Sequence, residues 1–426
     1  MTPMCFIKQT SIYCFILLML ASCRDQSQEN HALVFWSSSN PEEIKFTSRY
    51  IDQWNLANPA QPFVFQPVPE GQSSEEVILA AVVGKTTPDI YANMWQGDVE
   101  DFANSGVLIP LDTLDGFLSF LYERCDSLVV KEITSQDGHI YQIPWKVNPV
   151  MMMYNPLLFE QAGVDGIPKN YTSYLEAGRL LKLQQHWLGI SEVNAIWWQR
   201  FFNFLPLYYA ASGGAPLVEN GKAVFDNEYG IAVFAFLQQI YTRGYFPREQ
   251  MKGQSDPFLA GRVASSFTGP WTIEYNDRFK PKGMEFAFQE VLVPDGFSGP
   301  VYTYGDPKNI VIFNTCMDPE TAWQFLQTLL SAEADRDFLT LSGQFPRRKD
   351  IDTNPLFQEF LQAHPKILPF ARQAKYVRGM DSAPYMKEVL DIISQEYEAC
   401  VVYGLKTPEE AIHAAAKAVD LLYIHL

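Results

Sequence analysis

Aromatic side chains at predicted strand ends and loops are the residues of this sequence best suited to binding chemistry. The chain has 9 tryptophans and 21 tyrosines. A flat ring beside hydrogen-bonding groups complements a sugar, which presents apolar C–H faces and a rim of hydroxyls. The tryptophans at such positions are Trp36, Trp95, Trp145, Trp197, Trp198 and Trp271. Each could instead pack in a core, and adjacent Trp197 and Trp198 cannot share one helix face.

Polar side chains near the same predicted strand ends could supply the hydrogen bonds that such a ligand needs. The candidates are Asn93, Gln96, Asp98, Asn148, Asp306 and Arg347. Asp98 has an alternative role as a helix cap before residues 99–101. Arg347 could be a surface charge beside Arg348 and Lys349.

Sequence motifs of catalysis are missing. The chain has no GxSxG, HExxH, GxxxxGK[ST] or GxGxxG, and its 6 histidines are scattered. We therefore expect a protein that is not an enzyme and needs neither a metal nor another cofactor. A pair of carboxylates for glycoside hydrolysis is defined in space rather than in sequence, so a secreted carbohydrate-active enzyme stays open as an alternative.

The N-terminus has the pattern of an export signal. Lys8 precedes an apolar run over residues 12–20, which is too short to span a bilayer as a helix. Leu20-Ala21-Ser22-Cys23 resembles a bacterial lipobox. We expect residues 1–22 to be a signal peptide, Cys23 to be lipidated and residues 23–31 to form a tether, with an ordinary signal peptide as the alternative.

Charge and cysteine content exclude several classes of partner and site. The formal net charge of −17 makes nucleic-acid binding improbable and argues against a polyanionic ligand. Cys125, Cys316 and Cys400 are widely spaced and odd in number. They match neither a disulfide framework nor a zinc site, so we expect them to be buried as small apolar residues.

The order of predicted elements indicates an α/β fold. Strands over 32–36, 63–65 and 89–92 alternate with helices that begin at Asn40-Pro41 and at residue 75. This order predicts a mostly parallel sheet with helices on both faces and a ligand beyond the carboxyl ends of its strands. A second block from Trp145 contains predicted helices over 171–183 and 228–241. A strand over 310–313 follows, and later helices are capped by Asp318 and Thr407.

Several stretches in the same order resemble one known family. They are residues 88–90 with 102–112, residues 141–145 with 153–159, residues 258–264 with Gly269-Pro270-Trp271, and residues 319–323 with 342–347. In these stretches the chain resembles the extracellular solute-binding proteins of the ABC sugar-importer class that includes maltose-binding protein. The resemblance covers nearly all of the chain after Cys23.

The resemblance implies two α/β lobes, each a mostly parallel sheet flanked by helices, that close about a hinge. Lobe I would comprise residues 32–144 and 306–345, and lobe II residues 145–305 and 346–426. Crossovers would lie near 142–148 and 304–310. From residue type and position we expect the ligand contacts to be Trp36, Asn93, Trp95, Gln96, Trp145, Trp197, Trp271, Asp306 and Arg347. The resemblance supports Arg347 and implies that Trp271 stacks on a sugar ring.

The function that the resemblance implies is capture of a sugar or small oligosaccharide and its delivery to ABC permease subunits. We expect a monomer at the cell envelope, anchored by its lipid on the outer face of the cytoplasmic membrane or in the periplasm. A sensory binding protein that reports to a receptor would have the same sequence features, so it stays open as an alternative.

Overall fold

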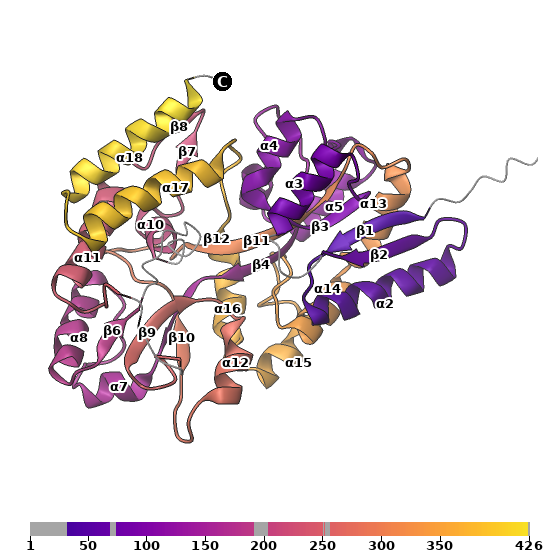
Figure 1. The fold of residues 1–426 in the computed structure, drawn as a ribbon. Helices are drawn as coiled ribbons and strands as arrows, with labels where there is room; N and C mark the ends of the chain where they lie inside the picture. The colour runs from indigo at the N-terminus through magenta and orange to yellow at the C-terminus, as the bar shows by residue number, and fades with distance from the viewer. Residues whose placement is uncertain (1–31, 69–73, 191–202, 250, 252–255, 425–426) are drawn as a thin grey trace, which may run out of the picture.

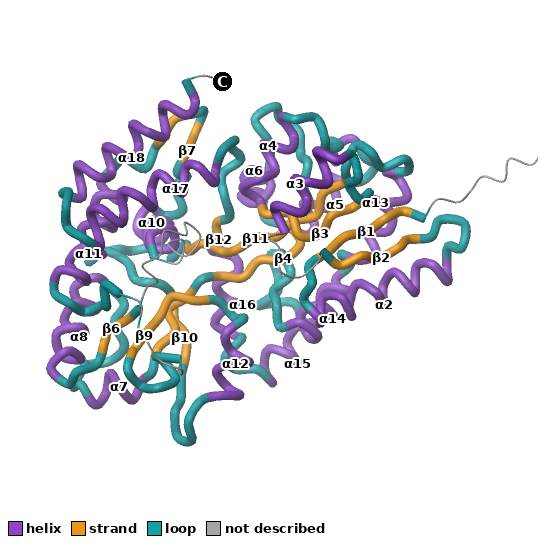
Figure 2. Tube along the Cα trace, in the orientation of Figure 1, coloured by secondary structure: helices purple, strands orange, loops and turns teal. Residues whose placement is uncertain are grey.

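The computed structural model describes residues 32–68, 74–190, 203–249, 251 and 256–424. Two α/β halves lie side by side, and long strands run from one into the other (Figure 1). In the tube view these are β4 (Ile143–Pro149) and β11 (Thr303–Ile312), with the short strand β12 (Val377–Arg378) beside β11 (Figure 2). The predicted lobe boundaries at 144/145 and 305/306 fall within β4 and β11.

The first half is built on a mixed sheet with the strand order β12-β11-β3-β1-β2, and β4 pairs with β11. β1 is parallel to both of its neighbours, whereas β11 is antiparallel to β3 and to β4. The three parallel strands agree with the predicted strand–helix–strand order. Their bounds are β1 Leu33–Ser37, β2 Phe63–Pro67 and β3 Ile90–Trp95.

Two apolar cores cover the faces of this sheet. One joins Phe35 and Ile310 to Phe46, Phe325 and other helix residues, and the second joins Tyr91 and Val311 to residues of α3 and α4. Figure 1 shows helices packed along this half. They are α2 Pro41–Ala57, α3 Ser74–Gly84, α4 Val99–Asn104, α5 Phe117–Arg124, α6 Ser127–Ile133, α13 Pro319–Leu329 and α14 Ala332–Ser342.

The second half is built on a sheet with the order β10-β5-β9-β6. Only β6 and β9 are parallel here, because β5 continues directly from β4 and both β9 and β10 run against it. The expectation of a mostly parallel sheet is therefore wrong for this half. The strands are β5 Met151–Tyr154, β6 Trp187–Gly189, β9 Val263–Thr268 and β10 Ala287–Gln289, with a separate hairpin of β7 Val218–Glu219 and β8 Lys222–Ala223.

Helices of the second half enclose the largest apolar core, which contains Tyr174, Leu207, Phe234, Leu390 and Ala415. They are α7 Pro156–Gln161, α8 Tyr171–Leu183, α10 Phe204–Ser212, α11 Glu228–Thr242, α17 Met386–Tyr397 and α18 Pro408–Tyr423. A further core joins β5 and β10 to α15 (Pro355–Ala363) and α16 (Leu368–Gln373), beside α12 (Thr272–Phe279). The predicted helix of residues 171–183 is therefore confirmed.

Local sequence signals set the helix ends as predicted. The Asn40 side chain accepts hydrogen bonds from the backbone N–H groups of Glu42 and Glu43, and Pro41 is the first helical residue. Thr407 and Glu410 form a reciprocal capping box. Cys125, Cys316 and Cys400 are buried and unbridged, which confirms their predicted role. Among the described helices, none has the length and apolar character of a membrane span.

A buried arginine ties the first half to the start of β4. The Arg124 guanidinium forms an ion pair with Asp335 of α14, and the Asp335 carboxylate also accepts from Arg348 at 3.1 Å. Arg124 additionally donates to the backbone carbonyls of Leu330 at 2.9 Å and Pro144 at 3.3 Å. One side chain, 2% exposed, therefore fixes α5, α14 and β4 relative to one another.

Removing this guanidinium should destabilise the fold strongly. Arg124→Ala leaves the buried Asp335 carboxylate with only Arg348, and breaking a buried pair in this way costs about 3–5 kcal/mol. Urea unfolding should show a lower midpoint for the variant at an unchanged m-value. The control is Arg179→Ala, which removes an exposed pair with Glu176 and should leave the midpoint in place. Equal midpoints for the wild type and Arg124→Ala would contradict this role.

Candidate functional site

The pairing of β4 with β11 gathers polar side chains on one face of the first sheet. Asn148 lies opposite Asp306, and Lys146 lies opposite Lys308, which in turn lies opposite Trp95 of β3. Cross-strand partners share a face, as do residues two apart on one strand. These five side chains therefore lie on the same side of the sheet, at the point where the chain passes from one half to the other.

A buried carboxylate holds one end of this cluster. Glu43, in the first turn of α2, forms an ion pair with Lys146 and accepts from Ser38 and from Gln344, each at 2.6 Å. Burial alone would raise the pKa of Glu43, but the Lys146 ammonium and these hydrogen bonds outweigh it and hold the pKa below its ordinary value. The pair is charged and fixed in position.

We call Glu43, Lys146, Asn148, Asp306 and Lys308 the polar floor. Lys308 lies 3.5 Å from Glu75 of α3 and 3.9 Å from Asp306. The Asn148 amide nitrogen donates to Gln344 at 3.4 Å, while its buried carbonyl oxygen has no hydrogen-bond partner among the described residues. A buried acceptor of this kind calls for a donor, and a ligand hydroxyl could provide one.

Trp271 stands at the edge of the second sheet nearest the polar floor. Thr268, the last residue of β9, pairs with Met151, which is three residues after Asn148. The Gly269-Pro270 turn follows, and the Trp271 ring lies so close over Gly269 that a Cβ atom there would come within 1.8 Å of it. The side chain is 46% exposed. The turn thus presents an aromatic face to solvent next to the crossover.

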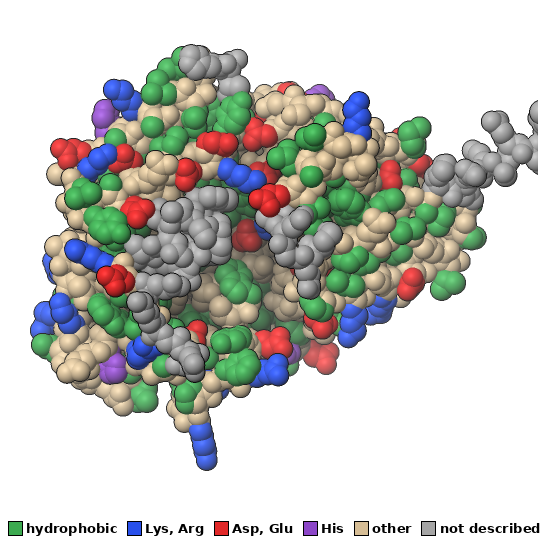
Figure 3. All heavy atoms as spheres, viewed as in Figure 1, with side chains coloured by type: hydrophobic (Ala, Val, Ile, Leu, Met, Phe, Trp, Pro, Cys, Tyr) green, Lys and Arg blue, Asp and Glu red, His purple; other side chains and the backbone are tan. Residues whose placement is uncertain are grey.

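The surface between the two halves is recessed in the space-filling view, with acidic and basic side chains around the recess (Figure 3). Contacts between the halves, made by Trp95 and Gln96, lie on one side of this recess. Gln96 donates to Met380 O at 2.6 Å and to Glu132 at 3.0 Å, and the Trp95 indole donates to the Tyr304 hydroxyl at 3.4 Å. The Gln96 amide is thus engaged in joining the halves.

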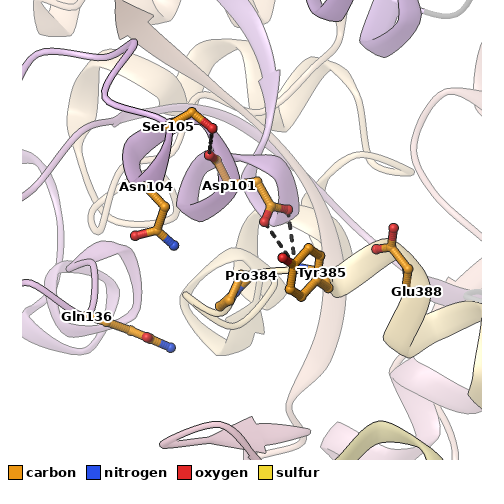
Figure 4. Close-up of a pocket in the computed structure, with 7 residues that line it drawn as sticks. All are labelled: Asp101, Asn104, Ser105, Gln136, Pro384, Tyr385 and Glu388. Atoms are coloured by element: carbon orange, nitrogen blue, oxygen red, sulfur yellow. Dashed lines mark hydrogen bonds between the residues drawn. The ribbon is translucent and has the colours of Figure 1, made fainter. Parts of the chain in front are cut away.

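A groove of about 620 Å³ marks the outer edge of this contact. Figure 4 shows Asp101 of α4 accepting two hydrogen bonds from the Tyr385 backbone N–H, at 3.1 and 3.3 Å. Asn104, Ser105, Gln136, Pro384 and Glu388 complete its lining. Nearby, Lys387 of α17 lies 3.0 Å from Asp98, so Asp98 bridges the halves, and its side chain accepts no capping hydrogen bond from α4.

Two of the ligand contacts proposed from the sequence, Trp145 and Arg347, are buried inside the protein. Trp145 is fully buried in the core of the first half, where its ring packs on Phe338 at 5.1 Å between ring centres and lies 4.8 Å from the Lys146 ammonium. Arg347 is also buried, where its guanidinium donates to Ala374 O and Val377 O. Both placements correct the prediction, since neither side chain is available to a ligand in this structure.

The remaining candidates differ in their surroundings. Trp36 is partly buried and donates to Gln66 at 2.8 Å, and Asn93 is buried in β3. Asp306 and Trp95 lie at the polar floor. Trp197 and Trp198 lie outside the described residues. Sequence reasoning missed Glu43, Lys146, Lys308 and Gln344. The alternation of polar and apolar residues over 145–148 could have indicated Lys146.

Comparison with known proteins identifies the family. Residues 59–368 match the family described as bacterial extracellular solute-binding protein. The chain belongs to this family. It is 22% identical over 350 residues to a maltotriose-binding protein of Pyrococcus abyssi, covering 79% of this chain and 73% of that protein. It is 26% identical over 355 residues to an arabinooligosaccharide-binding protein of Halalkalibacterium halodurans, covering 77% and 74%.

Solved structures of the same architecture support the two-lobed fold. An uncharacterised protein of Listeria monocytogenes superposes with a TM-score of 0.84 at 27% identity, over 92% of this chain and 99% of that one. The cyclic alpha-maltosyl-1,6-maltose binding protein of Arthrobacter globiformis gives a TM-score of 0.81 at 20% identity, over 93% and 99%. The predicted fold, two α/β lobes of the solute-binding family, is therefore confirmed.

No cluster of three or more histidine, cysteine, aspartate or glutamate side chains with the geometry of a metal site occurs in the described part of the chain. The members of the family named above are binding proteins. The chemistry of the polar floor is that of hydrogen bonding and ion pairing, since its charges face one another rather than a common vacant point.

The Asp98 bridge should make stability depend on pH in a defined direction. Burial raises the pKa of Asp98 to about 6, against the opposing effect of Lys387. A carboxyl group whose pKa is higher in the folded than in the unfolded state stabilises the fold at low pH, and this contribution is lost as pH rises to the folded value. Between pH 4 and 7 the wild type should therefore lose on the order of 2–3 kcal/mol that Asp98→Asn retains.

The measurement is urea unfolding at several pH values for both proteins. Asp52→Asn, which removes an exposed carboxylate on α2, serves as the control and should follow the wild type. Parallel pH profiles for the wild type and Asp98→Asn would show that this carboxyl group is not the source of the effect.

Proposed function

We propose that this protein binds a sugar or small oligosaccharide between its two lobes, without catalysing a reaction, and delivers it to an ABC permease. The observation that carries the proposal is the half-exposed Trp271 ring at a strand end next to the polar floor, in a chain of the solute-binding family. An aromatic face with fixed polar groups nearby suits a sugar ring. The named relatives, a maltotriose-binding and an arabinooligosaccharide-binding protein, support this ligand class.

The charge balance of the polar floor favours an uncharged ligand. Lys146 is paired with Glu43, and Lys308 lies between Glu75 and Asp306. Because each lysine already has a carboxylate partner, no unpaired positive charge is left to attract a phosphate group. The groups can still exchange hydrogen bonds with sugar hydroxyls, and the buried Asn148 carbonyl oxygen adds an acceptor without a partner among the described residues.

The same pairing argues against glycoside hydrolysis. A general acid needs a raised pKa, as in a carboxyl group within an apolar pocket. Glu43 and Glu75 have the opposite environment, because nearby lysines outweigh the effect of burial and lower the pKa of each. With their pKa values lowered, Glu43 and Glu75 can orient a ligand but donate protons poorly.

Trp271→Ala should weaken binding. A stacked indole removes a few tens of Å² of apolar surface from water, so its loss should weaken affinity by roughly tenfold, at about 25 cal/mol per Å² with the loss of shape added. A thermal-shift screen of mono- and oligosaccharides would first identify the ligand, since binding to the native state raises the melting temperature. Calorimetry would then compare the wild type, Trp271→Ala and Trp271→Phe.

Trp271→Phe retains a flat ring and should lose less affinity than Trp271→Ala. The melting curves without ligand serve as the control and should coincide, because a half-exposed ring contributes little to the core. An unchanged affinity in Trp271→Ala together with a large loss of stability would place this tryptophan in the core and overturn the proposed site.

We propose further that Cys23 carries a lipid that anchors the mature chain at the cell envelope, as the Leu20-Ala21-Ser22-Cys23 sequence suggests. Cys23→Ala should move the protein from the membrane fraction to the soluble fraction. Cys14→Ala alters a cysteine of the predicted signal peptide and should leave the protein in the membrane fraction. Membrane association of Cys23→Ala, or a native protein without lipid by mass spectrometry, would refute the anchor.

A further inference from the structure

Helix α12 exposes its aromatic side chains and buries a polar one. Trp271, Tyr275 and Phe279 are 46%, 51% and 54% exposed, whereas Asn276 is 3% exposed. A surface helix ordinarily turns apolar residues to the core and polar residues to water. Packing on the described cores does not account for the exposed rings of Tyr275 and Phe279, and an exposed apolar patch of this kind marks an interaction site.

The three rings form one stripe. They are four residues apart, so on an α-helix successive positions are turned by about 40° and rise by about 6 Å. The Tyr275 and Phe279 ring centres lie 4.8 Å apart with an interplanar angle of 48°. The Trp271 ring folds back over Gly269, toward the end of β9. The stripe thus begins at the ring assigned to the ligand and leads away from the polar floor along α12.

The opposite face of α12 holds the stripe in place. The Asn276 amide donates to the Met153 sulfur at 3.0 Å, and Ile273 packs on the core that contains Phe286 and Phe370. Asp277 lies 3.4 Å from Lys280 and forms a second ion pair with Lys366. A helix fixed along one face in this way presents its exposed rings at set positions, which lowers the entropic cost of binding.

We infer that Tyr275 and Phe279 are additional stacking positions for a linear oligosaccharide whose first ring lies on Trp271. The inference rests on the proposed function and narrows its ligand class to chains of at least three sugar units. A row one ring wide fits a chain of sugar rings, and exposed Glu274 and Arg278 flank one side of it with groups able to bond hydroxyls. The two flanking charges are opposite in sign, in keeping with an uncharged ligand.

The test measures affinity against ligand length by calorimetry, with maltose through maltohexaose and arabinobiose through arabinohexaose as probes. Wild-type affinity should rise with length beyond the disaccharide. Tyr275→Ala and Phe279→Ala should each lose roughly fivefold in affinity for the longest bound chain, as expected when a few tens of Å² of apolar contact are removed, and nothing for the disaccharide. Tyr275→Phe keeps the ring and should bind as the wild type does.

A matched control is Tyr122→Ala, which removes a tyrosine of α5 that is also 51% exposed and should leave every affinity unchanged. Two outcomes would overturn the inference and leave the proposed function standing. The first is a wild type that binds disaccharide with an affinity that does not change with chain length. The second is variants that bind long chains normally but fail in transport by permease-containing vesicles, which would assign the stripe to a protein contact. A wild type that binds no saccharide of either series would overturn the proposed function and the inference with it.

Discussion

β4 and β11 pair antiparallel from Ile143 opposite Ile310 to Pro149 opposite Gly305, and this register positions Lys146, Asn148, Asp306 and Lys308 of the polar floor. Beyond the paired region, Val150 donates to Tyr304 O at 2.8 Å, and the Thr303 hydroxyl donates to Val150 O at 2.7 Å. A slip of one residue would exchange the two faces of β4, turning Asn148 away from the polar floor and Val147 toward it. The Arg124 contacts with the start of β4 and with α14 oppose such a slip.

Placing charges at this crossover is costly, and the structure offsets the cost locally. A buried ion is tolerated when it is paired and its remaining hydrogen bonds are satisfied. Lys146 meets this condition through Glu43, whose carboxylate is completed by Ser38 and Gln344. These partners come from the end of β1, from α2 and from the segment after α14, so the floor is organised before any ligand arrives.

The sequence predicted those features that depend on local patterns. Helix starts at Asn40 and Thr407 follow from capping chemistry, and the parallel order of β1, β2 and β3 follows from alternating elements. Trp145 shows the limit. Its residue type suits a ligand contact, but a register shift in the pairing of β4 with β11, a strand more than 150 residues away in the chain, leaves its ring in the apolar core. The contact between Gln344 and Glu43 could not be predicted for the same reason. The two residues are 301 positions apart in the chain, and no local sequence pattern indicates that they are neighbours.

The core beneath α12 links the aromatic stripe to the crossover. Ile273 packs against an apolar cluster that contains Met151 of β5, Leu339 of α14 and Phe345. Leu339 belongs to a helix of the first half, and Phe345 accepts through its backbone carbonyl from Val147 of β4 at 2.8 Å. Moving α12 relative to β4 would open this close-packed cluster and lose its dispersion contacts. The packing of this cluster therefore holds the Trp271 platform and the polar floor at a fixed spacing.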